Sequence, residues 1–211
     1  MQETNYAEKL TNDFGQLENW NKYILDGDQD SLSTIYFCYY DLLFDYGLRH
    51  THDKQLVEDV IQDIFINFIK FRKTTGEVKN LTGYILTTFR NQLFHDLQKN
   101  KRFIMTGEFS EERFDYFKSP EQQISENDNS ERIHSTIRQC IGNLTAKQQE
   151  IIFLRFEREI SYHEIALILN ISVDSCYKST YRAIKTIRSE VEMILGKGAN
   201  ILLLAFFRHS V

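Results

Sequence analysis

Two cations in the C-terminal half of the chain have the type and spacing that DNA contact needs. Lys178 and Arg182 stand four residues apart, which places them one turn apart on the same face of a helix. Upstream, Ser161 and Glu164 have the spacing of a capping box that starts a shorter helix. The segment Leu144–Arg188 is therefore predicted to be a helix-turn-helix whose second helix enters a groove of duplex DNA.

A second group of polar residues lies in the N-terminal half. Asp59, Gln62 and Asp63 are spaced i, i+3 and i+4, so they share one face of a helix predicted over 54–71. Glu58 and Asn67 belong to the same polar side, which carries no cation between these two residues. The pattern by itself fits a solvated surface as well as a binding face.

The His-Asp pairs allow a different chemistry. His52-Asp53 and His95-Asp96, together with His50, suggest a metal-dependent phosphohydrolase of the HD type. Such a centre needs further His and Asp residues that converge on it. Both pairs are predicted at helix edges or on a basic face, so we expect exposed histidines at helix ends, with no metal, no cofactor and no enzymatic activity.

Composition predicts an all-α protein. The 211 residues are 42% hydrophobic and 26% charged, with one Pro. Amphipathic periodicity predicts helices at 30–48, opened by Asp30 or Ser31, at 54–71 and at 81–101. Four more are predicted at 132–143, 145–157, 162–169 and 172–195, the last capped by Ser172 or Asp174.

Charge divides the chain into parts. The net charge is −5, yet 81–102 and 172–188 each carry +3, whereas 103–131 carries eight acidic and two basic residues. An acidic protein grips phosphates poorly unless its charge is segregated in this way. We predict an N-terminal extension (1–20), a helical domain (21–102), an acidic linker (103–131), a helix-turn-helix domain (132–195) and an apolar tail (196–211).

The cysteines and the N-terminus indicate a reducing location. Cys38, Cys140 and Cys176 are far apart and odd in number, so we expect three small buried residues rather than disulfides or zinc ligands. Residues 1–17 are polar and acidic, unlike a secretory signal. A cytoplasmic location is expected.

The order of these motifs resembles the sigma-70 family. Asp59-Val60-Ile61-Gln62-Asp63-Ile64-Phe65, followed by Tyr84 to Asn91 and a basic helix end, is similar to region 2, and the helix-turn-helix is similar to region 4. Over about 24–191, the chain resembles an extracytoplasmic-function sigma factor, the type that has only these two regions. The resemblance implies promoter-specific initiation of transcription.

The resemblance also implies residue roles. Core RNA polymerase would bind Asp59, Gln62, Asp63 and Phe65, although Phe65 fits a buried position equally well. Melted minus-ten DNA would meet the set Tyr84, Arg90, Asn91, Lys99, Lys101 and Arg102. Duplex minus-35 DNA would meet the set Ser175, Tyr177, Lys178, Tyr181 and Arg182. Cys176 is expected to pack inward, and Tyr181 is either a contact or a core residue.

Three points depart from the family or stay open. His95 stands where the family often has Asp, which leaves base preference there undecided. The linker fits a solvated tether or a segment lying in a cationic RNA channel. The apolar segment 199–207 is too short to span a membrane and fits either intramolecular packing or a further partner. An anti-sigma factor is implied by the resemblance, and a stand-alone helix-turn-helix regulator is the alternative function.

Overall fold

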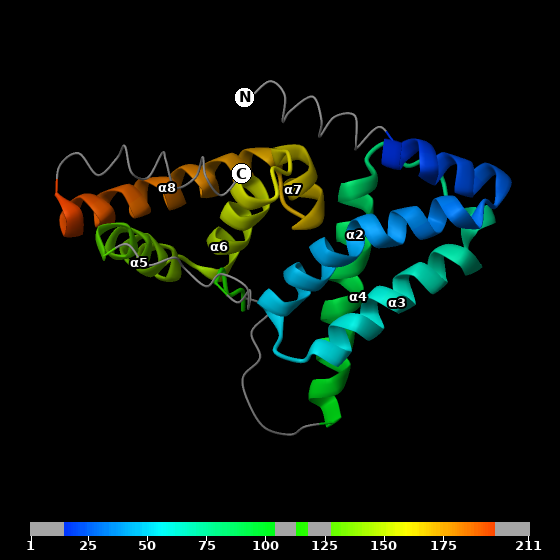
Figure 1. Cartoon of the computed structure of the whole chain (residues 1–211), viewed down its shortest axis with the longest axis horizontal. Helices are drawn as coiled ribbons and strands as arrows, with labels where there is room; N and C mark the ends of the chain where they lie inside the picture. The colour runs from blue at the N-terminus through cyan, green and yellow to red at the C-terminus, as the bar shows by residue number, and fades with distance from the viewer. Residues whose placement is uncertain (1–14, 104–112, 118–127, 197–211) are drawn as a thin grey trace. The chain divides into compact units, whose positions relative to one another are not determined.

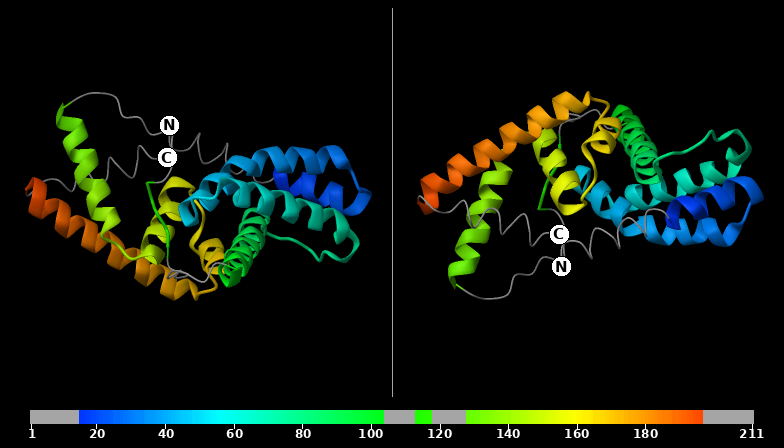
Figure 2. Two further views of the ribbon diagram at one scale, coloured as in Figure 1. Left: turned by 90° about the horizontal axis from the view of Figure 1, so that it is seen from below. Right: turned by 90° about the horizontal axis from the view of Figure 1, so that it is seen from above.

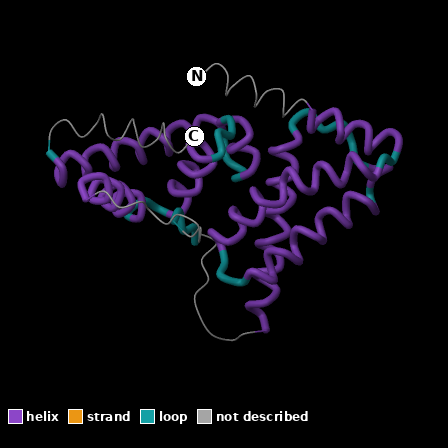
Figure 3. Tube along the Cα trace, in the orientation of Figure 1, coloured by secondary structure: helices purple, strands orange, loops and turns teal. Residues whose placement is uncertain are grey.

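The computed structural model describes residues 15–103, 113–117 and 128–196. The chain divides into two compact units, Met1–Met105 and Thr106–Val211. The described residues form helices joined by loops and turns, and they contain no strand (Figure 3). The predicted all-α fold with two helical domains is confirmed.

The first unit consists of helices that pack around an antiparallel pair. A helical segment at 15–26 precedes α2 (Gln29–His50), α3 (Lys54–Lys70), a 3-10 turn at Arg72–Thr74 and α4 (Leu81–Phe103). Figure 1 shows α2 and α3 side by side and α4 crossing both. The apolar stripes predicted for these helices face one another in this arrangement and form the core.

Aspartate side chains cap the N-termini of α2 and α3. The Ser31 N–H donates to Asp28 Oδ2 at 3.3 Å, so α2 begins at Gln29, and the predicted caps at Asp30 and Ser31 were wrong. The Leu56 N–H donates to Asp53 Oδ1 at 3.0 Å at the start of α3. Each carboxylate satisfies an amide that the first helical turn leaves without an intrahelical partner.

Gly47 is the point of closest approach among α2, α3 and α4. A Cβ atom added to Gly47 would lie 2.7 Å from Val57 Cγ1 and 2.9 Å from Phe89 Cζ. Both contacts are shorter than van der Waals distance, so any side chain here would force the three helices apart.

The segment 15–26 belongs to this core. Trp20 and Tyr23 are fully buried, and the Tyr23 hydroxyl donates to the Phe68 carbonyl oxygen at 3.1 Å. Arg72 Nη1 donates to the Ile24 carbonyl oxygen at 2.8 Å, a cation at the negative end of the helix. The predicted extension 1–20 therefore differs from the structure, because its last residues are part of the first unit.

The second unit is built on one long helix. Its elements are α5 (Asp128–Gly142), α6 (Ala146–Ile152), a π-helical turn at Phe153–Glu157, α7 (Tyr162–Ile168) and α8 (Val173–Leu195). α5, α6 and α7 all pack on α8 (Figure 2). The helix predicted at 145–157 is continuous, but its last turn widens to the i to i+5 pattern.

The turns of the helix-turn-helix follow the predicted signals. Ser161 and Glu164 form the expected capping box, with the Ser161 N–H donating to Glu164 Oε2 at 2.8 Å. Asn170 has a φ of 50°, a conformation that Asn tolerates better than most residues do. Of the two caps predicted for α8, Ser172 is the one used, since the Ser175 N–H donates to its Oγ at 3.1 Å.

Part of the predicted linker is anchored on the second unit. Phe114 and Tyr116 are buried, with ring centroids 5.6 Å and 6.5 Å from that of Phe153. The Tyr116 N–H donates to Gln149 Oε1 at 3.3 Å. α5 also begins at Asp128, inside the predicted linker. The count of charged residues did not reveal this anchoring, because acidic residues surround the short aromatic cluster.

The cysteines divide between core and surface. Cys140 and Cys176 are buried as predicted, whereas Cys38 is exposed on α2, so the prediction of three buried cysteines was wrong. Burial raises the pKa of the Cys140 thiol to about 11, with the nearby Glu190 adding to the effect. This thiol is neutral at ordinary pH.

No helix among the described residues has the length and apolar character that crossing a bilayer requires. The apolar segment 199–207 lies outside the described residues, so both of its predicted roles stay predictions.

Candidate functional site

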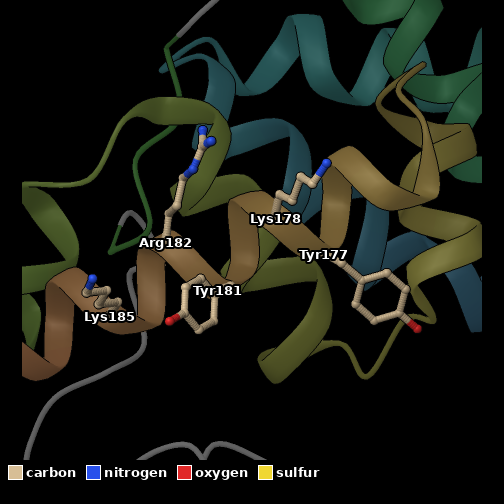
Figure 4. Close-up of a pocket in the computed structure, with 5 residues that line it drawn as sticks. All are labelled: Tyr177, Lys178, Tyr181, Arg182 and Lys185. Atoms are coloured by element: carbon tan, nitrogen blue, oxygen red, sulfur yellow. The ribbon is translucent and has the colours of Figure 1, made fainter.

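The exposed face of α8 carries cations and aromatic rings together. Tyr177, Lys178, Tyr181, Arg182 and Lys185 border an open hollow of about 560 Å³ (Figure 4). In this view Lys178 and Arg182 extend from one side of the helix, and the two tyrosine rings extend from another. Lys185 is an addition to the predicted set, and its spacing from Tyr181 and Arg182 could have indicated it.

Exposure decides which α8 residues are available to a ligand. Tyr181 is 68% exposed and Tyr177 is 51% exposed, so neither is a core residue. Cys176 is buried, as predicted. Ser175 is exposed, and its hydroxyl pairs with Ser172 Oγ at 2.8 Å within the cap of the helix.

Three contacts involve this face and its neighbours. The Tyr177 ring lies against the Tyr162 ring of α7, with centroids 4.1 Å apart, and the Arg155 guanidinium lies over the Tyr162 ring, 4.9 Å from its centroid. Lys178 Nζ lies 2.7 Å from Asp174 Oδ2. Because that ion pair is exposed, it is worth little energy, and Lys178 can exchange the carboxylate for a phosphate.

α4 presents a second polar face. Tyr84, Asn91 and Lys99 recur at spacings that place them on the same side of the helix, and Asn91 and Lys99 are exposed. Arg90 lies to the flank, with its guanidinium 4.5 Å from the Phe94 ring centroid. Lys101 and Arg102 lie within α4, but their side chains are outside the described part of the chain.

Tyr84 is half-buried and is held by other rings. Its ring stacks on Phe68 at a centroid distance of 5.6 Å and an interplanar angle of 27°. The Trp20 ring lies 5.6 Å away at 58°. Burial raises the pKa of the Tyr84 hydroxyl, which is therefore neutral at ordinary pH.

The exposed face of α3 is acidic with apolar neighbours. Asp59, Gln62 and Asp63 are all exposed, and Gln55 Nε2 donates to Asp59 Oδ1 at 2.9 Å. The next turn of this face adds Ile66, which is 44% exposed.

Phe65 does not share this face. It is 6% exposed, and its ring packs against that of Tyr36 on α2 at 5.0 Å. The sequence allowed Phe65 to be either a polymerase contact or a buried residue, and the structure agrees with the buried position. Ile66 and Ile69 are the apolar residues that α3 exposes instead, and sequence reasoning missed both.

The His-Asp pairs have other roles. His50 is buried, with its ring centroid 4.9 Å from that of Tyr46, and Asp53 caps α3. His95 Nδ1 pairs with Asp96 Oδ1 of its own dipeptide at 3.0 Å. Across residues 15–103, 113–117 and 128–196 there is no group of three or more His, Cys, Asp or Glu placed to hold a metal.

The described residues have the features of a DNA-binding protein that also binds a protein partner. Each unit supplies part of these features. The second unit is a helix-turn-helix whose long helix exposes cations and rings, the geometry of a DNA-binding module. The first unit offers a polar helix face with an aromatic residue and, separately, an acidic face suited to a protein partner.

Family models agree with this class. A model of sigma-70 region 2 matches residues 35–103, and a model of sigma-70 region 4 matches residues 134–187. The RNA polymerase sigma factor YlaC of Bacillus subtilis is 26% identical over 157 residues, which is 74% of this chain and 88% of that protein. The extracytoplasmic-function sigma factor SigX of the same organism is 22% identical over 171 residues, 79% of this chain and 86% of that protein.

Solved structures share the fold. The sigma factor RpoE of Bartonella quintana, in complex with the anti-sigma factor NepR, has a TM-score of 0.54 at 16% identity and covers 77% of this chain and 97% of its own. CnrH, in complex with the cytosolic domain of CnrY, has a TM-score of 0.55 at 14% identity and covers 85% and 99%.

The chain belongs to the sigma-70 family, in its extracytoplasmic-function group. It is an RNA polymerase sigma factor that acts in transcription initiation with core polymerase and promoter DNA.

Proposed function

We propose that the three exposed helix faces divide the work of initiation. α3 docks to core RNA polymerase through Asp59, Gln62 and Asp63, aided by the apolar Ile66. α4 holds the melted minus-ten strand through the side that carries Tyr84 and Asn91. α8 enters the major groove of the minus-35 element, where cations and hydrogen-bonding side chains contact phosphates and base edges.

The observation that supports this division most directly is the exposure of α3. Three acidic or amide side chains stay exposed with two apolar neighbours, Ile66 and Ile69, although the opposite face of the helix is buried in the core. An exposed apolar residue rimmed by polar ones is typical of a protein interface. A DNA-facing helix would not carry carboxylates there, because they repel phosphates.

The charge distribution favours a dependence on polymerase binding. With a net charge of −5 and only +3 on each basic segment, the protein neutralises few phosphates when it binds DNA alone. Once polymerase holds α3, the local concentration of promoter DNA around α4 and α8 rises, and two weak contacts together become specific. We therefore expect the isolated protein to bind promoter duplex poorly at physiological salt.

The proposal also covers catalysis, cellular location and regulation. The protein catalyses no bond chemistry itself and works in the cytoplasm, where polymerase is found. RpoE was solved with the anti-sigma factor NepR and CnrH with the cytosolic domain of CnrY, and this chain shares their fold. We propose that an anti-sigma factor likewise holds this chain inactive.

Reconstitution with core polymerase and a pool of genomic fragments tests the function. Mapped transcripts should start at sites that share two upstream elements. The double variant Asp59→Arg with Gln62→Ala should lose co-purification with core polymerase, whereas Glu18→Arg, an exposed charge reversal on the segment 15–26, should keep it. Unchanged co-purification of the double variant would remove the assignment of α3. Tight, salt-sensitive duplex binding without polymerase would favour a stand-alone regulator.

A further inference from the structure

Three aromatic side chains from three separate segments meet in the first unit. Trp20 comes from the segment 15–26, Phe68 from α3 and Tyr84 from α4. Trp20 meets Phe68 edge to face, with centroids 5.2 Å apart and an angle of 83°. Each of the two also contacts the Tyr84 ring at 5.6 Å.

The three rings differ in exposure. Trp20 is 1% exposed and Phe68 is 4% exposed, whereas Tyr84 is only half-buried. Tyr84 therefore packs one side of its ring in the cluster and stays partly exposed, and its spacing places it on the same side of α4 as Asn91. A ring fixed on one side and open on the other loses little side-chain entropy when a flat ligand stacks on it.

The backbone around the cluster is fixed as well. The Tyr23 hydroxyl donates to the carbonyl oxygen of Phe68, and Arg72 Nη1 donates to the carbonyl oxygen of Ile24. These two bonds tie the segment 15–26 to the end of α3 and to the 3-10 turn that follows it, so they oppose any separation of Trp20 from Phe68.

We propose that Trp20 and Phe68 are positioning residues that hold Tyr84 as a platform for one unpaired base of the melted promoter strand. The proposal rests on the function of α4 given above and adds the segment 15–26 to the DNA-opening machinery. Base stacking on an aromatic ring needs a defined ring plane. Phe68 sets the plane of the Tyr84 ring by stacking on it, and Trp20 packs against the same ring and prevents it from tilting.

The test uses holoenzyme on a promoter at which transcripts have already been mapped. 2-Aminopurine is placed at each position of the melted minus-ten strand in turn, because its fluorescence rises when it is unstacked and is quenched on an aromatic ring. Wild-type holoenzyme should quench one position relative to its neighbours. Trp20→Leu should lower the stacked-to-unstacked ratio at that position by up to about fivefold, which corresponds to loss of a base stack worth about 1 kcal/mol. Trp20→Phe should retain most of the quenching.

Leu43→Ala is the matched control. Leu43 is a fully buried residue of α2 that is not part of the ring cluster, so Leu43→Ala destabilises the same unit and leaves all three rings in place. Per active holoenzyme, the Leu43→Ala variant should quench 2-aminopurine as strongly as the wild type does. Absence of a quenched position in the wild type, or equal quenching in Trp20→Leu and the wild type, would overturn the proposal while leaving transcription by this sigma factor established.

A measurement without any variant guards against misfolding of Trp20→Leu. Trp20 is the only tryptophan in the chain, so growth with 5-hydroxytryptophan labels this one site, and its red-shifted excitation separates it from the tryptophans of unlabelled core polymerase. Emission from this label should change when the promoter opens and should not change on a strand that lacks the stacked base. Identical emission on both strands would contradict the proposal.

Discussion

Phe65 and Ile66 are consecutive residues on α3 that point to opposite environments. Phe65 packs in the core against Tyr36, and Ile66 is exposed beside Asp63 and Gln62. The apolar part of the proposed polymerase interface is therefore displaced by one residue from the position that the sequence pattern suggests.

Substitutions at these two positions should separate stability from binding. Phe65→Ala should destabilise the protein by about 3 to 5 kcal/mol, since it leaves a cavity in the core. Ile66→Ser should change stability by less than about 1 kcal/mol and weaken binding to core polymerase. Thermal unfolding and a polymerase pull-down measure the two effects. Equal loss of stability in both variants would contradict this placement of Ile66.

Asn91 is the amide that α4 exposes on the same side as Tyr84. Asn91→Ala should reduce open-complex formation about tenfold, the effect of losing one hydrogen bond of about 1 to 1.5 kcal/mol, and leave polymerase binding intact. Permanganate reactivity of melted thymines measures opening. Gln92→Ala is the control, because the Gln92 amide is already bound to Asp96 Oδ2 at 2.8 Å. Loss of polymerase binding by Asn91→Ala would mean that the function of α4 is misassigned.

Arg182 should matter more than other cations of α8. Arg182→Ala should weaken binding of holoenzyme to a minus-35 duplex and lower the slope of its salt dependence by about 1. Arg188→Ala is matched in residue type, helix and exposure, but Arg188 lies outside the hollow bordered by Tyr181 and Arg182. Titration at several salt concentrations compares them, and equal effects would show that only the general charge of α8 matters.

The aromatic anchor at 113–117 should stabilise the second unit. Phe114→Ala removes a buried ring that contacts Phe153, and we expect a loss of about 3 kcal/mol in the free energy of unfolding. Asp115→Ala changes a half-buried neighbour and should have a much smaller effect. Chemical denaturation compares the two variants. No loss of stability in Phe114→Ala would show that the segment is a tether.

Thiol labelling should distinguish the three cysteines. Cys38 is exposed and should react within the native protein, whereas Cys140 and Cys176 should react only after unfolding. Because burial raises the pKa of Cys140 to about 11, an increase in pH to 9 should not speed its labelling. A thiol-specific dye measures the rates, and Cys38→Ser should remove the fast phase. A fast phase that survives this change would place one of the other thiols at the surface.

The sequence alone determined those features that depend on interactions between residues close together in the chain. Helical periodicity and the Ser161–Glu164 capping box depend on residues within about four positions of each other, so each can be predicted from the chain itself. The order of the two regions and the charge pattern then indicated the family, and with it the kind of partner.

Tertiary structure decided which of these residues are available. The spacing of Phe65 and Tyr181 fits a core or a surface equally well, and only packing of the neighbouring helices buries the first and exposes the second. Trp20 and Phe114 come from segments that composition predicted to be an extension and a linker, yet each ring is buried against a residue about 40 or more positions away, Phe68 and Phe153. Burial is a property of contacts between distant segments, and a pattern of period 3.6 carries no information about which segments will meet.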